Sequence, residues 1–260
     1  MTPQATALWH KLPADWAAQL SACCARADGV RSDATAVFFR ADDVAVPGRQ
    51  LQRLLDIFTR HKVPLGLAVV PAWLTSPRWN AISHMGASGA DLWCWHQHGW
   101  QHRNHEPRGK KQEFGPSRPT DALYADLDRG RQRLLSIMGN AFTPIFTPPW
   151  NRCSEITLAL LQEMGYNAVS RSRGSQPPPP PGFPDHAVDV DLHTDRAPTA
   201  AIGWQKLAAS LMEGLTRPAC GIMIHHQRMN DAAFGFLDKL LETLRRQHRL
   251  HMVDLRDLPT

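Results

Sequence analysis

The stretch DLWCWHQHGWQH, residues 91–102, joins an apolar run to a turn rich in histidine. Trp93 and Trp95 alternate along the run, a pattern that favours a strand with both tryptophans in the core. His98 and His102 lie four residues apart, a spacing that suits two imidazoles on one face of a helical turn, close enough to share a metal ion. Such a pair also occurs by chance in a chain with 13 histidines. The interpretation therefore depends on what surrounds this stretch.

Outward from this stretch, strand-like runs alternate with helical patterns. The run AVFFRADD (36–43) precedes an amphipathic helix at 49–61, and residues 71–91 read as a less regular segment. Further strands are expected at 65–71, 145–150, 167–171, 187–193, 220–226 and 250–255, and further helices at 120–139, 154–165, 202–216 and 231–247. Alternation of this kind implies an α/β fold with a mostly parallel sheet, and seven or eight such units favour a (β/α) barrel over an open sheet.

The sequence divides into a short N-terminal segment and one large domain. Residues 1–30 read as an N-terminal helical appendage that packs on the rest, and residues 31–260 as the barrel. Within the barrel, residues 175–184 (SQPPPPPGFP) can be neither helix nor central strand, because consecutive prolines fix φ and remove backbone donors. We expect an exposed, stiff loop there.

Composition narrows the class of protein. A chain of 260 residues with 43% hydrophobic content can bury one large core, and its net charge of +5 is spread among mixed signs, which favours solvated surfaces over nucleic-acid binding. No apolar run is long enough for a transmembrane segment, and no signal-like start is present. Five cysteines without a CxxC motif indicate neither a disulfide framework nor a thiolate zinc site. A cytoplasmic protein is the expectation.

Polar side chains gather where the expected strands end, which in a (β/α) barrel is the functional face. They include two adjacent carboxylates, a histidine pair and a distant histidine, the ingredients of a two-His-one-carboxylate metal site with a general base and a general acid. A metal with three protein ligands can activate water, which indicates hydrolysis, although iron(II) oxygenases use the same ligand set. The residues concerned are Asp42, Asp43, His98, His102, Pro149, Asp191 and His225.

Five short motifs in order resemble those of the polysaccharide deacetylases, the NodB-homology or carbohydrate esterase family 4 group. They are RADD (40–43), HGWQH (98–102), FTPPWN (146–151), VDVDLH (188–193) and IMIHH (222–226). The resemblance implies a deformed, NodB-like (β/α) barrel of about seven parallel strands and a metal-dependent hydrolase. Such an enzyme removes an N- or O-acetyl group from a sugar or glycan intermediate through a metal-activated water. Zinc is the expected metal, with cobalt, nickel or manganese as alternatives.

The resemblance also assigns roles by position. Asp43, His98 and His102 would bind the metal, and Asp42 would be the base. His225 would protonate the leaving group, with His226 as the competing candidate because strand alternation points only one of them inward.

For the substrate, the resemblance implies an apolar wall made by Pro149 and Trp150 around the acyl methyl. Asp191 is assigned to substrate binding, with Asp189 as the alternative. His105, just beyond the histidine pair, is a further candidate contact to substrate, although ordering of the loop is an equal alternative.

One departure from the family pattern bears on catalysis. The family usually has Arg at the start of the third motif, where this chain has Thr147. Arg40, two residues before Asp42 on the same face of a strand, could replace that charge, or Arg152 could reach back to the base. Without a replacement, a catalytically impaired carbohydrate-binding barrel becomes the alternative function.

The substrate class follows from the expected compartment. A cytoplasmic enzyme should meet nucleotide-linked or lipid-linked sugars before finished polymer, so a biosynthetic intermediate is the expected substrate. A metal-dependent deformylase of a lipid-linked amino sugar is a further alternative. The segment PRGKKQEFG (107–115) is expected to be a plain exposed loop; the other interpretation is a lid whose Lys110 or Lys111 meets an anionic substrate group. The oligomeric state does not follow from the sequence.

Overall fold

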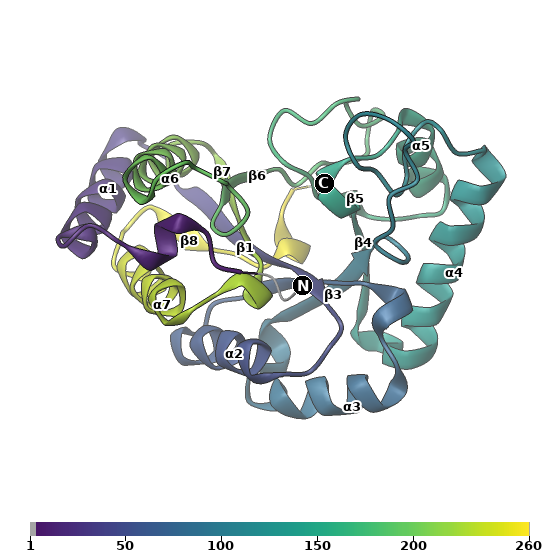
Figure 1. The fold of residues 1–260 in the computed structure, drawn as a ribbon, viewed down its shortest axis with the longest axis horizontal. Coiled ribbons are helices and arrows are strands. Elements are labelled where there is room, and N and C mark those ends of the chain that lie inside the picture. Colours follow the sequence, from purple (N-terminus) through teal and green to yellow (C-terminus); the bar gives the residue numbers. More distant parts are fainter. Residues whose placement is uncertain (1–3, 260) are drawn as a thin grey trace.

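A computed structural model describes residues 4–259 and contains one curled parallel sheet with helices on its outer side (Figure 1). Within these residues the strand order is β5-β4-β3-β2-β1-β7-β6, with β8 paired to the start of β1. The strands are β1 (Thr35–Val44), β2 (Leu65–Val69), β3 (Trp93–His98), β4 (Phe142–Thr147), β5 (Ala168–Val169), β6 (Val188–Asp191), β7 (Ala219–Ile224) and β8 (Leu250–Met252). The predicted deformed barrel of about seven parallel strands is confirmed.

The barrel is only loosely closed between its two outermost strands. Isolated bridges, Val169 with Asp185 and Ser172 with Val188, link the chain after β5 to the chain around β6 in place of a continuous ladder. The carboxyl ends of the strands meet at one edge because all pairings are parallel. That edge is where polar strand ends can converge.

Seven α-helices are found in residues 4–259. They are α1 (Trp16–Val30), α2 (Arg49–His61), α3 (Ser76–Met85), α4 (Thr120–Met138), α5 (Glu155–Glu163), α6 (Ala200–Leu215) and α7 (Asp231–Arg245). The sequence predicted all of them except α3, which lies in the stretch read as irregular. Thr75 caps this helix by accepting from Arg78 N, and Pro77 suits its first turn. Its weak apolar periodicity explains why it was missed.

The central strand β1 sets the position of the functional edge. Nearly every residue from Thr35 to Val44 is buried, as expected for a parallel strand covered on both faces. Phe39 packs edge-to-face on Phe58 of α2, with ring centroids 5.3 Å apart. The strand therefore presents its last residues, including two aspartates, at the middle of the barrel edge.

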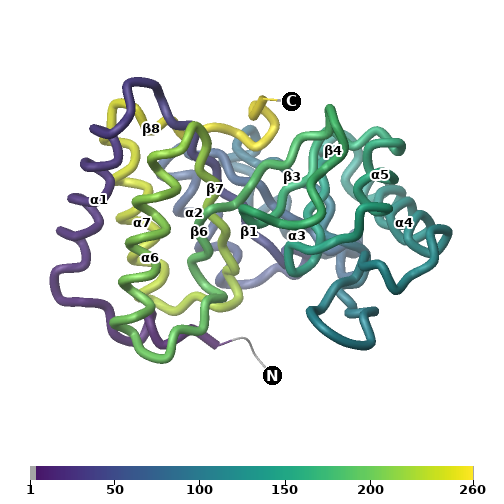
Figure 2. The backbone as a smooth tube through the Cα atoms, turned by 90° about the horizontal axis from the view of Figure 1, so that it is seen from above, coloured from purple at the N-terminus to yellow at the C-terminus, as the bar shows by residue number. Residues whose placement is uncertain are grey.

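The N-terminal helix α1 lies beside α6 and α7 (Figure 2), where Leu20 and Cys24 are buried in the main core cluster. Before it, Trp9 is also buried and donates from Nε1 to Leu192 O at 2.9 Å, just after β6. Residues 4–30 therefore share the core of the barrel rather than forming one of their own, and residues 1–3 of the predicted appendage lie outside the described part.

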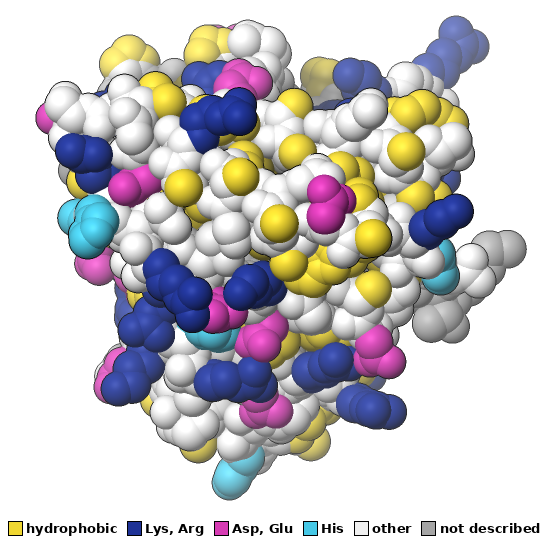
Figure 3. Space-filling model, turned by 90° about the vertical axis from the view of Figure 1, so that its left-hand side faces the viewer, with side chains coloured by type: hydrophobic (Ala, Val, Ile, Leu, Met, Phe, Trp, Pro, Cys, Tyr) yellow, Lys and Arg dark blue, Asp and Glu magenta, His cyan; other side chains and the backbone are white. Residues whose placement is uncertain are grey.

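The surface is mixed in charge. On the face shown in Figure 3, Lys and Arg side chains lie among Asp and Glu rather than forming a field of one sign. Within residues 4–259, no helix has the combined length and apolar character that crossing a bilayer requires. The loop at 175–184 lies mostly at the surface, with Phe183 alone buried in it.

Candidate metal centre

Three potential metal ligands converge at the carboxyl edge of the barrel. Asp43 lies near the end of β1, His98 is the last residue of β3, and His102 lies in the loop that follows. One ligand atom from each lies within 4.8 Å of the other two. Asp43 Oδ1 is 3.4 Å from His98 Nε2 and 3.2 Å from His102 Nε2. The structure thus brings together the three residues that the sequence singled out.

The way the pair is presented differs from the expectation. His98 and His102 do not share a helical turn: the chain leaves β3 through Gly99, whose φ is +59°, and His102 itself has a φ of +58°. This reversal folds the loop back so that both Nε2 atoms face Asp43. Gly99 is suited to the turn because glycine adopts positive φ without steric cost.

A backbone contact fixes the orientation of the His98 ring. His98 Nδ1 lies 2.9 Å from Thr147 O, and a carbonyl oxygen only accepts, so Nδ1 carries the proton. In the neutral ring the lone pair is then on Nε2, the atom that faces Asp43. This is the arrangement that metal-ligating histidines usually have, in which one ring nitrogen is held by a protein acceptor and the other is free for the ion. Burial alone would lower the pKa of His98, but the Asp43 and Asp42 carboxylates outweigh it and raise that pKa, so a metal would displace the Nε2 proton on binding.

The loop that carries His102 is held by a buried carboxylate. Glu113, which is 0% exposed, accepts from Trp100 N at 3.1 Å and Gln101 N at 2.6 Å. The His102 ring contacts that of Trp150, with centroids 4.5 Å apart. Sequence reasoning missed Glu113, because it lies eleven residues further along in a segment read as exposed loop. That expectation was wrong for its second half, where Phe114 is buried too.

The charges at the three ligands suit a cation. Burial alone would raise the pKa of Asp43, but the imidazoles of His98 and His102 outweigh it and hold that pKa below its usual range. Burial and the neighbouring His98 lower the pKa of His102 to about 4, so this ring is neutral at pH 7. Asp43 Oδ1 is buried without a properly oriented hydrogen-bond donor anywhere in residues 4–259. A buried, unsatisfied oxygen beside two imidazole nitrogens fits a divalent metal such as zinc.

Asp42 lies beside these ligands but is held differently. Arg40 Nε donates to its Oδ1 at 2.8 Å and Arg40 Nη2 to its Oδ2 at 2.9 Å, and both side chains are almost completely buried. Burial raises the pKa of Asp42, but the Arg40 guanidinium, together with His98 and His225, leaves it lowered. The same guanidinium donates to Ser170 and Asn151, which fixes its plane.

Thr147, at the position where the family usually has an arginine, contacts a histidine instead of the base. The Thr147 hydroxyl lies 3.0 Å from His96 Nε2, and His96 Nδ1 lies 3.1 Å from Cys94 O. Burial lowers the pKa of His96 to about 3, so the ring is neutral, donates to Cys94 O, and accepts from Thr147. Arg152 does not contact Asp42; its Nη1 is 3.5 Å from Lys111 O. Of the two replacements considered for the family arginine, only Arg40 has the contact.

The metal ligands line a cleft of about 510 Å³. His225 lines it, whereas its neighbour His226 is 4% exposed and does not, and burial lowers the pKa of His226 to about 4. Asp191 also lines the cleft. The alternative, Asp189, instead pairs with Arg173 at 2.8 Å. The geometry thus favours His225 and Asp191 as residues accessible to a substrate.

Two residues expected to contact the substrate do not line the cleft, and two cations that line it carried no sequence signal. Trp150 lines the cleft, but Pro149 and His105 do not. Pro149 is buried behind the loop, against Gly99. Four cationic side chains border the cleft, of which the sequence flagged Lys111 and, for another role, Arg152; Arg196 and Arg228 carried no sequence signal because they follow β6 and β7 in irregular loops.

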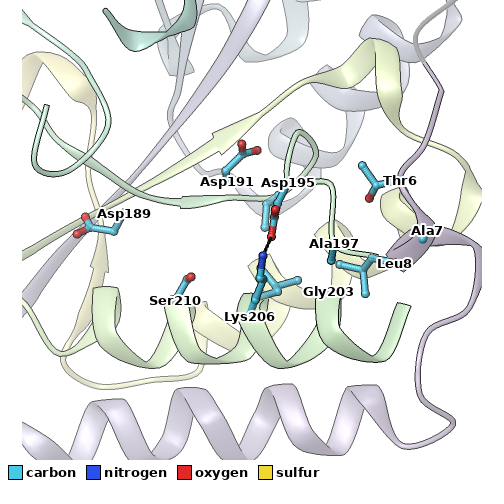
Figure 4. A pocket seen from close by; sticks show the side chains of 12 residues that line it. Thr6, Ala7, Leu8, Asp189, Asp191, Asp195, Ala197, Gly203, Lys206 and Ser210 are labelled. Atoms are coloured by element: carbon cyan, nitrogen blue, oxygen red, sulfur yellow. Dashed lines mark ion pairs between the residues drawn. The ribbon is translucent and has the colours of Figure 1, made fainter. Parts of the chain in front are cut away.

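A separate cavity of about 220 Å³ lies between the N-terminal segment, β6 and α6 (Figure 4). Asp195 and Lys206 form an ion pair of 3.4 Å there, and Asp189 and Asp191 both border it. No histidine lines this cavity in the described structure. Its lining offers no arrangement of acid, base and ligand comparable to that of the larger cleft.

Comparison with known proteins agrees with this geometry. The polysaccharide deacetylase family model matches residues 31–169, more than half of the chain, and the chain therefore belongs to that family. Membership supports a carbohydrate deacetylase or esterase function and makes a divalent metal plausible at the three ligands. No curated protein matches the chain significantly.

Solved structures show the same fold at low sequence identity. The T48 deacetylase with substrate has a TM-score of 0.53 at 14% identity, over 86% of this chain and 89% of its own. A family 4 acetyl xylan esterase from Clostridium thermocellum, in complex with cobalt, has 0.57 at 15%, over 85% and 89%. A family 4 pseudoenzyme from Bacillus anthracis has 0.57 at 13%, over 88% and 66%.

Proposed function

We propose that this protein is a metal-dependent deacetylase that hydrolyses an N- or O-acetyl group on a sugar or glycan intermediate. One observation carries the proposal: Asp43 Oδ1, buried and without a hydrogen bond in residues 4–259, faces Nε2 of both His98 and His102. A divalent metal bound there, most suitably zinc with cobalt, nickel or manganese as alternatives, supplies Lewis-acid activation of water and of the acyl oxygen.

The remaining steps belong to side chains of the cleft. Asp42 takes the proton of the attacking water, and Arg40 keeps its carboxylate ionised and oriented. His225, whose Nδ1 is buried without a partner in the described residues, protonates the leaving nitrogen or oxygen. Trp150 supplies an apolar surface for the acyl group or sugar. Asp191 borders the same cleft and orients the substrate.

We further propose a nucleotide-linked or lipid-linked sugar as substrate and a cytoplasmic location. Five cysteines without a disulfide in the described structure support a reducing compartment. Sugars carried on nucleotides or lipids are the intermediates available there.

Metal content and product release test the proposal together. Protein purified without a chelating column should carry about one divalent ion per chain by elemental analysis, and His102→Ala should lose it. A screen of acetylated and formylated amino sugars should then release acetate. Formate release instead would identify a deformylase of a lipid-linked amino sugar. A wild type that binds no added zinc would refute the metal-dependent mechanism.

A carbohydrate-binding barrel without turnover is the second candidate. It is favoured by Thr147, which occupies the place of the arginine expected next to the base. Saturable sugar binding with metal bound and no product from any acylated sugar would support it. The buried contact between Arg40 and Asp42 is the reason for ranking the active enzyme first.

A further inference from the structure

A second cavity, of about 450 Å³, adjoins the metal cleft. It lies between the loop at Lys110–Gln112, the turn after β4 and residues 172–176. Trp150, Asn151, Arg152 and Ser172 border both cavities. The two cavities therefore adjoin at these residues, and a ligand long enough to occupy both would pass Trp150.

The two cavities differ in charge. The metal cleft is lined by both signs of charge: three carboxylates, Asp42, Asp43 and Asp191, and four cations, Lys111, Arg152, Arg196 and Arg228. None of the residues that line the second cavity, all within the described part of the chain, is an aspartate or glutamate, and its charged residues are Lys110, Arg152 and Arg173. An anionic group attached to a sugar would meet carboxylates as well as cations in the metal cleft, but only cations in the second cavity.

Two of these cations are available to a ligand. Arg173 is engaged by Asp189 at 2.8 Å. Neither Lys110 nor Arg152 has a carboxylate within ion-pair distance in residues 4–259. Side chains of Gln112, Ser175 and Gln176 add neutral donors. Two free cations with neutral donors suit a phosphoryl group, which carries up to two charges and several acceptor oxygens.

We propose that the second cavity binds a phosphoryl group attached to the sugar whose acyl group is hydrolysed at the metal cleft. Lys110 and Arg152 are the recognising cations, and Trp150 lines both cavities. The location of the acyl group at the metal cleft rests on the proposed function, whereas binding of the phosphoryl group in the second cavity can be measured without it. The phosphoryl group belongs to a nucleotide or to a lipid carrier.

Equilibrium binding by calorimetry tests the inference without requiring turnover. UDP-N-acetylglucosamine and a farnesyl diphosphate-linked N-acetylglucosamine should each bind about tenfold or more tightly than the neutral methyl glycoside. Lys110→Gln, at a residue that lines only the second cavity, should remove about tenfold of that advantage and leave binding of the neutral glycoside unchanged. Arg152→Gln should also lower the ratio of the two affinities about tenfold. Whichever phosphorylated probe binds more tightly identifies the carrier.

Arg108→Gln is the matched control, because Arg108 is an exposed cation of the same loop and lines neither cavity. An equal loss in this variant would mean a general charge effect and would overturn the assignment. Equal affinity for neutral and phosphorylated sugars would also overturn it. So would equal affinity for phosphorylated sugars and for N-acetylmuramic acid, whose anionic group is a carboxylate. Acetate release without a preference for phosphorylated sugars would support the proposed function and refute the phosphoryl site. A preference for phosphorylated sugars without release of any product would support the phosphoryl site and not the proposed function.

Discussion

Two strand ends, those of β1 and β6, each present a pair of aspartates, and Asp43 at β1 is held very differently from Asp189 at β6. At β6, Asp189 is satisfied by Arg173, Arg217 and the backbone N of Gly221. At β1, Asp43 keeps a buried oxygen without a donor in the described residues. A satisfied buried carboxylate stabilises the fold, whereas an unsatisfied one indicates a missing partner. Sequence alone cannot separate the two.

The largest expected difference is between Asp43→Ala and Asp189→Ala. The Asp43 variant should lose its metal and its activity while folding normally, because the oxygen removed has no donor to lose. The Asp189 variant should keep the metal but lose about 1–3 kcal/mol of unfolding free energy, since it leaves Arg173 without its carboxylate and the backbone N of Gly221 without its acceptor. Elemental analysis and denaturant unfolding measure both. Metal retained in Asp43→Ala would break the comparison.

A second contrast concerns catalysis with the metal in place. Asp42→Asn should lower kcat by about 10²–10⁴-fold, as expected for a lost general base, with metal content unchanged. Asp191→Asn should have a much smaller effect, because Asp191 mainly accepts from His193 N and Thr194 N in its own loop. Comparable losses of kcat in the two variants would show that Asp42 is not the base.

The Arg40 contact gives a smaller, pH-dependent effect. Arg40 helps to lower the pKa of Asp42, so Arg40→Gln should raise that pKa and shift the acid limb of the kcat/KM profile to higher pH. Exchanging the two residues, Arg40→Thr with Thr147→Arg, should return the limb toward the wild-type position if charge is what matters. An unshifted limb in Arg40→Gln would remove Arg40 from the mechanism.

The smallest effect is expected in stability near β6. His186 precedes this strand, and burial lowers its pKa to about 4. The unfolded chain, with a histidine pKa of about 6.5, binds more protons, so unfolding free energy should fall as pH drops from about 6.5 toward 4. The loss attributable to His186 is about 1–2 kcal/mol at pH 5. Denaturant unfolding at pH 7 and pH 5 should show a smaller difference in His186→Gln, with activity at pH 7 unchanged.

Sequence patterns predicted the barrel because the spacing of apolar residues and the polar ends of strands can both be read from short stretches of sequence. The apolar run that begins at Ala36 and ends in two carboxylates indicates a buried strand with a polar end. Side-chain alternation placed Arg40 on the face of Asp42, where the contact is found. The His98–His102 spacing indicated two histidines that do lie together, but a positive-φ reversal rather than a helical turn brings them there.

Interactions across long loops were not predictable in the same way. Glu113 supports the His102 loop through backbone amides, and no side-chain pattern encodes that contact. Arg196 and Arg228 reach the cleft from loops after β6 and β7, whose paths depend on tertiary packing. The distinction between Asp189 and Asp191 likewise depends on which partners surround β6.

Backbone conformation carries a final consequence. Among residues 4–259, five non-glycine residues have positive φ, and all but Lys62 border the cleft: Asp43, His102, Trp150 and Asn151. Each such residue adds of order 1–3 kcal/mol of backbone conformational free energy, so the loops that carry the ligands keep this strained conformation only because the surrounding barrel holds it. Local opening rather than global unfolding should then set how fast their amide protons exchange with deuterium. A cation that ties Asp43 to His102 should slow that exchange and leave the core strands unaffected.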